Sequence, residues 1–246
     1  MLHSSVGVIV ESDLTITLPK LDITITKTLT IEASTITFTH EKGFHLVNVR
    51  YEGATYTYIA LLAREWPEVI NIAVKLISGK PLSDVEEQGL RELAESTGWS
   101  TSDIIDELKN INVSPSERVE VYRELFEKYY REALELKERD TVQASEKLWG
   151  AITALIKLHA TLTNTPIIVW AHGKLYNYVV SNVPREYRRL FIDMLEAGEP
   201  LHRHFYERTL SQEAFIECWG KAVELIEMIK EIVYREAQRR GLTFKT

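Results

Sequence analysis

The order of apolar and polar residues changes once along the chain, near residue 65. Before that point, the run LTITLPKLDITITKTLTIEASTITFTH at residues 14–40 alternates Thr with Leu or Ile. A period of two is typical of half-buried β-strands, and both residue types favour strands. Turn residues at 41–43 and 52–53 separate this run from FHLVNVRY and TYTYIALL. The pattern therefore predicts an antiparallel meander over residues 5–62.

After residue 65 the apolar residues recur at spacings of three and four, which predicts amphipathic helices. The first of these is EWPEVINIAVKLI, and the second begins at Ser83, with Glu86 placed to complete a capping box. A turn at Gly98 then leads into a short further helix. The two helices on either side of Gly98 resemble a helix-turn-helix, although Thr97 and Glu107 stand where that motif usually has apolar residues.

The charge of this helix-turn-helix-like segment argues against a role in DNA binding. Between Ser83 and Leu108 there are eight acidic residues and a single arginine, Arg91. A recognition helix that approaches phosphates needs the opposite charge. We therefore expect the two helices to pack as a hairpin within the protein.

The residues that follow Pro115 are almost wholly helical in pattern. One apolar stripe runs along a first helix, through Val119, Tyr122, Phe126, Tyr129, Ala133 and Leu136. Asp140 and Gln143 cap a second helix that is apolar on most of its circumference, and Gly150 with Ala151 would let another backbone approach it closely. Further helices are predicted at 169–180, at 185–199 with an end near Gly198 and Pro200, and from Ser211 to a stop at Gly241.

These patterns predict an α+β protein with a small antiparallel β-rich N-terminal module and a C-terminal antiparallel helical bundle of about five helices. The length of 246 residues is sufficient for two domains. The segment NINVSPS at 110–116 is the predicted linker. It divides residues 1–112, the β-rich module with its acidic helix-turn-helix-like segment, from residues 113–246, the bundle.

Composition narrows the function classes. The chain is 45% hydrophobic and 26% charged, and no stretch approaches the roughly 18 consecutive apolar residues of a membrane span. The N-terminus lacks the features of a secretory signal, so a cytoplasmic location is expected. Cys218 is the single cysteine, which excludes intramolecular disulfides and zinc sites built on cysteine pairs. The net charge of −7 disfavours nonspecific attraction to nucleic acid or anionic membranes.

The run EPLHRHFYE at residues 199–207 concentrates side chains that carry chemistry. A metal site is disfavoured if the run is helical, because His202 and His204 would then point about 200° apart. A structural joint between two helices is the main interpretation, with His204 facing solvent. The alternative is a binding pocket, for which the candidate residues are Glu146, Lys147, His202, Tyr206 and Glu207. No catalytic residue, metal site or cofactor is predicted.

The C-terminal half resembles the archaeal PaREP family. The resemblance rests on the core helix ASEKLWGA and on the step LHRHFYE, where the family pattern is LHxNFYE and has Asn in place of His204. It extends over about Ser116 to Arg240. It implies a helical bundle related to the HEPN group of nucleotidyltransferase-associated domains, which are often dimeric, with no established activity in the PaREP branch.

HEPN nucleases carry an arginine a few residues before a histidine on one helix, where the two groups act on a phosphate. No arginine stands five to seven residues before His159, His172, His202 or His204. Sequences typical of nucleotide loops, dinucleotide folds, hydrolase elbows and zincins are also absent. The cluster REYRR at 185–189 is the best local argument for a phosphate contact.

We therefore expect a noncatalytic binding or assembly protein, built on a dimerising HEPN-like helical bundle. The expected partners are a second copy of the chain and a small nucleotide or a protein, and neither nucleic acid nor a membrane is expected. Two other classes stay open. One is an enzyme acting on nucleotides or RNA, and the other is a transcription regulator that uses the helix-turn-helix-like segment.

Overall fold

The structure is a computed structural model that describes residues 9–18, 23–32, 35–41, 44–51, 54–59, 67–110, 115–163, 172–242 and 244. The chain divides into two compact units. The first comprises Met1–Glu92 and Thr101–Asn112, and the second comprises Leu93–Ser100 and Val113–Thr246. The end of one helix of the N-terminal half therefore belongs to the C-terminal unit.

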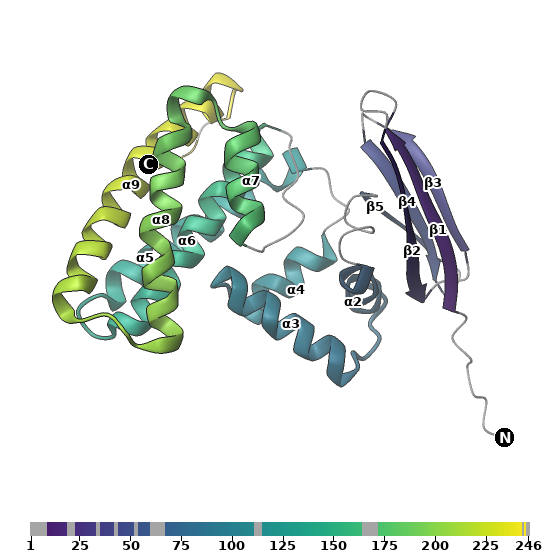
Figure 1. Ribbon diagram of the computed structural model, residues 1–246, viewed down its shortest axis with the longest axis horizontal. Helices are drawn as coiled ribbons and strands as arrows, with labels where there is room; N and C mark the ends of the chain where they lie inside the picture. The colour runs from purple at the N-terminus through teal and green to yellow at the C-terminus, as the bar shows by residue number, and fades with distance from the viewer. Residues whose placement is uncertain are drawn as a thin grey trace. The chain divides into compact units, whose positions relative to one another are not determined.

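The first unit begins with strands (Figure 1). Strands β1 (Ile9–Leu18) and β2 (Ile23–Glu32) pair antiparallel, as do β3 (Thr35–Glu41) with β4 (Phe44–Tyr51) and β4 with β5 (Ala54–Ile59). The pairing gives one two-stranded and one three-stranded sheet. Most of the turn residues predicted between the strands, at 42–43 and 52–53, lie outside the described residues.

Three helices complete the first unit: α2 (Pro67–Ser78), α3 (Asp84–Thr97), of which the last residues belong to the second unit, and α4 (Thr101–Lys109). The predicted capping box at the start of α3 is confirmed. The Ser83 backbone N–H donates to Glu86 Oε2 at 2.8 Å, and the Glu86 N–H donates to Ser83 Oγ at 3.4 Å. The apolar faces of α2 and α4 are buried, with Ile70 and Ile104 fully inaccessible to solvent.

The predicted α+β fold class with a β-rich N-terminal module is corrected by the structure. Among the residues whose side chains are described, 85% are helical and none lies in a strand. That part of the chain forms eight α-helices, α2 to α9. Three of these helices lie within residues 1–112. The alternation of apolar and polar residues ends at Ile59, and from α2 onward apolar residues recur at the helical spacings of three and four. The core formed by the described side chains is therefore all-helical.

The second unit contains a short 3₁₀ turn, η1 (Pro115–Arg118), followed by five helices. These are α5 (Val119–Leu136), α6 (Thr141–Leu162), α7 (His172–Asn182), α8 (Arg185–Glu207) and α9 (Gln212–Arg239). Helix α6 lies at the centre and contacts each of the other four. From Ala144 to Leu162 every residue except Lys147 is buried, which confirms the prediction from its apolar circumference.

The predicted helix ends are confirmed where the signal is local. Asp140 Oδ1 accepts hydrogen bonds from the N–H groups of Val142 and Gln143 at the start of α6. Ser211 Oγ accepts from Ala214 N–H at the start of α9. Gly241, just after α9, has a φ of +78°, the left-handed conformation that ends many helices.

The predicted break near Gly198 and Pro200 is wrong. Helix α8 continues through both residues and ends at Glu207, followed by Arg208 in the left-handed conformation with φ 52°. Close packing against α6 explains the glycine at position 198, because a Cβ atom there would lie 2.5 Å from Ile152 Cδ1. Pro200 removes one N–H donor from the helix, and the surrounding packing maintains the helix in spite of this loss.

Candidate functional site

Three of the predicted binding residues lie together where α6 and α8 meet. His202 Nδ1 is 2.9 Å from Glu146 Oε2, and both side chains are buried. The His202 ring stacks on Trp149, with ring centroids 4.9 Å apart and an angle of 21° between the planes. The Tyr206 ring meets His202 edge-on at 5.2 Å. Burial raises the pKa of the Glu146 carboxyl, and the hydrogen bond from His202 opposes that rise.

The two other predicted binding residues are placed differently. The Lys147 ammonium lies 3.0 Å from Glu132 Oε2 and 4.9 Å from the centre of the Tyr129 ring, so it pairs with α5. Glu207 is exposed at the last residue of α8. The structure therefore does not bring the five candidates into one pocket.

The same cluster donates hydrogen bonds to the end of α3. Tyr206 Oη donates to Glu95 O at 3.0 Å and Trp149 Nε1 to Ser96 O at 3.2 Å. The Thr153 hydroxyl lies 2.9 Å from Thr97 O and also 2.9 Å from Gly150 O, so the two carbonyls share its hydrogen. The Glu95, Ser96 and Thr97 carbonyls belong to the last turn of α3, where a helix supplies no N–H donors of its own, although Glu95 O also accepts the N–H of Gly98, just after the helix, at 3.3 Å. We call this set of contacts the α3 joint. The joint expected from EPLHRHFYE was between the helix before this run and the helix that begins after Ser211, whereas the run lies within α8 and Tyr206 contacts α3.

The turn after α3 completes the joint. Gly98 has a φ of +69° and packs against Gly150 so closely that a Cβ atom on Gly150 would lie 2.7 Å from Gly98 O. The indole N–H of Trp99 donates to Gly150 O at 3.0 Å. The predicted close approach at Gly150 is thus confirmed, and the approaching backbone is the turn of the helix-turn-helix-like segment.

The prediction that His204 faces solvent is wrong. Its side chain is buried, and its Nδ1 accepts the Leu210 N–H at 3.1 Å, which fixes the connection between α8 and α9. Burial, together with the nearby Arg208, lowers the pKa of His204. On the helix, His202 and His204 contact different neighbours, as the angle between successive helical positions requires.

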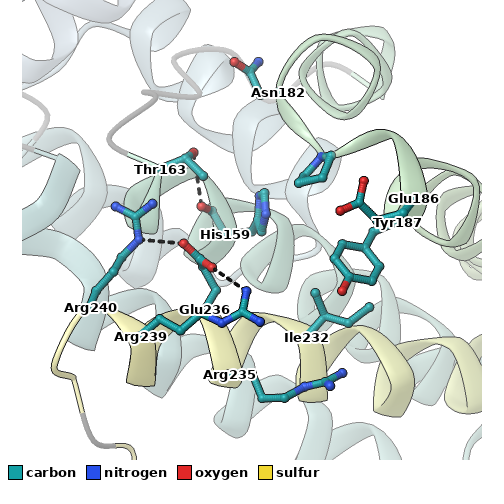
Figure 2. A pocket seen from close by; sticks show the side chains of 11 residues that line it. His159, Thr163, Asn182, Glu186, Tyr187, Ile232, Arg235, Glu236, Arg239 and Arg240 are labelled. Atoms are coloured by element: carbon teal, nitrogen blue, oxygen red, sulfur yellow. Dashed lines mark hydrogen bonds and ion pairs between the residues drawn. The ribbon is translucent and has the colours of Figure 1, made fainter.

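A cavity of about 360 Å³ lies elsewhere in the second unit, between the ends of α6, α7 and α9 and the start of α8 (Figure 2). This volume is within the range of small-molecule sites. Its lining consists of His159, Thr163, Asn182, Pro184, Glu186, Tyr187, Ile232, Arg235, Glu236, Arg239 and Arg240. None of the five predicted binding residues is among them.

The α9 wall of the cavity carries three arginines and one carboxylate. Arg240 Nε lies 2.9 Å from Glu236 Oε1, and Arg239 Nη1 lies 3.6 Å from Glu236 Oε2, so this carboxylate is held between two guanidinium groups (Figure 2). Arg235 Nε donates to the backbone carbonyl of Glu231 at 3.2 Å. Among the described residues, no carboxylate forms an ion pair with Arg235.

His159 forms the inner wall of the cavity and is uncharged at neutral pH. Its Nδ1 lies 2.6 Å from Tyr178 Oη, and its ring meets Phe191 edge-on at 5.1 Å. Burial lowers the pKa of His159 to about 4, an effect that the Glu236 carboxylate partly opposes and Arg240 reinforces. The positive charge of the cavity therefore comes from its arginines.

Sequence reasoning missed this cavity, although two signals pointed near it. The cluster REYRR supplies Glu186 and Tyr187 to the lining, while its arginines do not line it. The basic residues at the end of α9, Arg239 and Arg240, indicate on their own only the C-terminus of a helix. Neither signal indicates that the two segments meet, because they are about 50 residues apart in the sequence.

Two kinds of feature do not occur among the described residues. Within that part of the chain, no group of three or more His, Cys, Asp or Glu side chains is arranged to hold a metal ion. No helix among the described residues combines the length and apolar character needed to cross a membrane.

One family model matches part of the C-terminal half. Residues 121–226 match the Archaeal PaREP1/PaREP8 family. The resemblance read from ASEKLWGA and LHRHFYE is thereby confirmed. Neither the curated proteins nor the solved structures gave a significant match. The PaREP region, residues 121–226, includes the cavity residues of α6, α7 and α8, whereas Ile232 and the charged residues of α9 lie beyond it.

Proposed function

We propose that this protein is a noncatalytic binding protein whose ligand is a small anionic molecule held in the cavity at the end of α9. One observation carries the proposal. A cavity of about 360 Å³ is lined by three arginines, Arg235, Arg239 and Arg240, in a chain whose net charge is −7. Arginine forks match carboxylate and phosphate groups, so their concentration at one cavity favours an anionic ligand.

The lining supports binding more than catalysis. It contains no serine or cysteine that could act as a nucleophile. His159 bonds to Tyr178 and is uncharged, with a pKa of about 4, which is far below the value suited to a general base at neutral pH. Glu236, the acid of α9 that lines the cavity, already forms ion pairs with Arg239 and Arg240.

No observation on the described residues favours the alternative functions. The pocket of Glu146, Lys147 and His202 that would indicate a nucleotide- or RNA-acting enzyme is not formed, since Lys147 pairs with Glu132. The turn of the helix-turn-helix-like segment contacts Gly150 of α6. The expected homodimer rests on the HEPN-like resemblance alone, because one chain already buries the apolar circumference of α6.

Titration calorimetry on the full chain tests the proposal. The probes are acetate, citrate, inorganic phosphate and adenosine 5′-monophosphate, with adenosine as the uncharged comparison. At least one anion should bind, and Arg235→Gln or Arg239→Gln should weaken its binding roughly tenfold to hundredfold, as expected for loss of a charge-assisted hydrogen bond. Arg203→Gln, an exposed arginine of α8 outside the cavity, is the matched control. Binding of no anion, or binding that is equally strong in the cavity variants, would contradict the proposal.

A further inference from the structure

The Glu236 carboxylate occupies the position of an anionic ligand group. It lies between the guanidinium groups of Arg239 and Arg240 on the cavity wall (Figure 2). Because it is attached to the same helix, its effective concentration at the two arginines is high. A free carboxylate with the same single charge would gain little by replacing it.

The charge of the cavity lining indicates which kind of ligand could replace the Glu236 carboxylate. The cavity contains three arginines against Glu186 and Glu236, so its lining has one excess positive charge. If the Glu236 carboxylate moves out of the cavity, the excess rises to two. A doubly charged anion would then balance the lining and would bind the arginines more strongly than a singly charged one. Phosphate monoesters carry close to two negative charges at neutral pH.

We infer that the cavity binds a phosphate monoester, whose phosphate displaces the Glu236 carboxylate from Arg239 and Arg240. This inference rests on the proposed function and names its ligand class. Arg235 stands one helical turn before Arg239, on the same side of α9, and can approach the same phosphate. Three oxygen acceptors and three guanidinium forks are complementary in number and geometry.

The rest of the cavity is available to the organic part of the ester. A volume of about 360 Å³ exceeds what a phosphate group needs. Tyr187 and Ile232 line the cavity beside the arginines (Figure 2). They supply an aromatic and an aliphatic surface against which an apolar or planar group can pack. The ester should therefore bind more tightly than inorganic phosphate.

The test compares Glu236→Gln with Glu224→Gln. Glu224 is an exposed acid of α9 outside the cavity, so its variant makes the same change in net charge. Calorimetry at pH 7.5 uses inorganic phosphate, glycerol 3-phosphate, adenosine 5′-monophosphate and acetate, and thermal melts confirm that both variants fold. We expect Glu236→Gln to strengthen binding of both esters on the order of tenfold, by removing the internal competitor. It should also let acetate bind, and Glu224→Gln should leave every affinity unchanged.

The outcomes separate this inference from the proposed function. If Glu236→Gln weakens ester binding, Glu236 positions the arginines or contacts the ligand, and the displacement is refuted. If citrate or acetate binds the unmodified protein through Arg235 and Arg239 as tightly as the esters do, the cavity binds anions but the phosphate assignment fails. If inorganic phosphate binds as tightly as both esters, the organic part plays no role and the ligand is free phosphate. If nothing binds either form, the proposed function itself fails.

Discussion

At the scale of single residues, His159 shows how burial sets chemistry. Its ring is almost inaccessible on α6, and burial lowers its pKa from an ordinary 6.5 to about 4. The folded state therefore binds fewer protons than the unfolded state between these two values, so protonation favours unfolding. Stability from this residue is fully present above pH 6.5 and is lost as the pH falls toward 4.

We predict that the free energy of unfolding falls by roughly 3 kcal/mol from this residue over that pH range. In His159→Gln the titrating group is gone, so the difference in stability between the unmodified protein and the variant should shrink by that amount from pH 7 to pH 4. Urea unfolding at several pH values measures the difference. A difference that is constant with pH would show that His159 stays protonatable in the folded state.

Gly198 offers a second prediction at this scale. A Cβ atom there would lie 2.5 Å from Ile152 Cδ1 and 3.1 Å from the Trp149 ring, so Gly198→Ala should destabilise the protein by about 1 to 3 kcal/mol. Gly220 on α9 is the control, because a Cβ atom at that position meets no atom within 4 Å. Gly220→Ala should stabilise the helix by roughly 0.5 to 1 kcal/mol. Thermal melts of the two variants should therefore shift in opposite directions.

At the scale of elements, the α3 joint connects α3, α6 and α8, and one of its three donors, Tyr206, was a predicted binding residue. His202 and Tyr206 belong to the run EPLHRHFYE, which the sequence allows to be either a structural joint or part of a binding pocket. The structure gives Tyr206, Trp149 and Thr153 as donors to the last carbonyls of α3. Of these three hydrogen bonds only the one from Thr153 to Thr97 O is fully buried, and a buried carbonyl without a donor costs free energy, so this bond should contribute most to holding the end of α3.

We predict that Thr153→Val destabilises the protein by about 1 to 3 kcal/mol, because it leaves the Thr97 carbonyl buried without this donor. Thr161→Val is the matched control on the same helix. The Thr161 hydroxyl donates to Leu158 O within its own helix, so its loss should cost less. Chemical denaturation compares the two. Equal effects would show that the bond from Thr153 to α3 contributes no more than a bond within α6.

The variant His202→Ala distinguishes a role in stability at the α3 joint from a role in anion binding. Removing the ring leaves the buried Glu146 carboxylate without its hydrogen bond, so stability should fall by about 1 to 3 kcal/mol. Anion binding measured on the folded variant should be unchanged, since His202 does not line the cavity. Glu207→Gln should change neither property, because the side chain is exposed. A loss of anion binding in His202→Ala, with stability maintained, would instead support the pocket predicted from the sequence.

Local signals explain which elements could be predicted. The caps at Ser83, Asp140 and Ser211 and the stop at Gly241 each depend on neighbours in the sequence, and the structure confirms them. The end of α8 could not be predicted in this way. Gly198 reads as a helix stop from sequence alone, and only the contacts with Ile152 and Trp149 show why it lies within a helix.

At the scale of the whole molecule, the cavity shows why sites are harder to predict than helices. Its lining comes from three stretches of the chain, at 159–163, 182–187 and 232–240. Each stretch is an ordinary helix end when considered alone. Their meeting depends on the packing of α7, α8 and α9 around α6, for which no local pattern exists. The family match also ends at residue 226, before the arginines that give the cavity its charge.

Net charge gives the last prediction, which concerns nucleic acid. The full chain should show no binding to a random DNA duplex that weakens steeply as salt rises, because its charge is −7 and the helix-turn-helix-like segment is acidic. Fluorescence anisotropy at about 50 and 200 mM salt measures this directly, since neutralised phosphates make affinity fall strongly over that interval. Submicromolar, salt-sensitive binding that is abolished by changing Thr101 and Ser102 would contradict the prediction. It would place the contact on α4, whose first residues those are, and would favour a DNA-binding regulator over a binding protein for small anions.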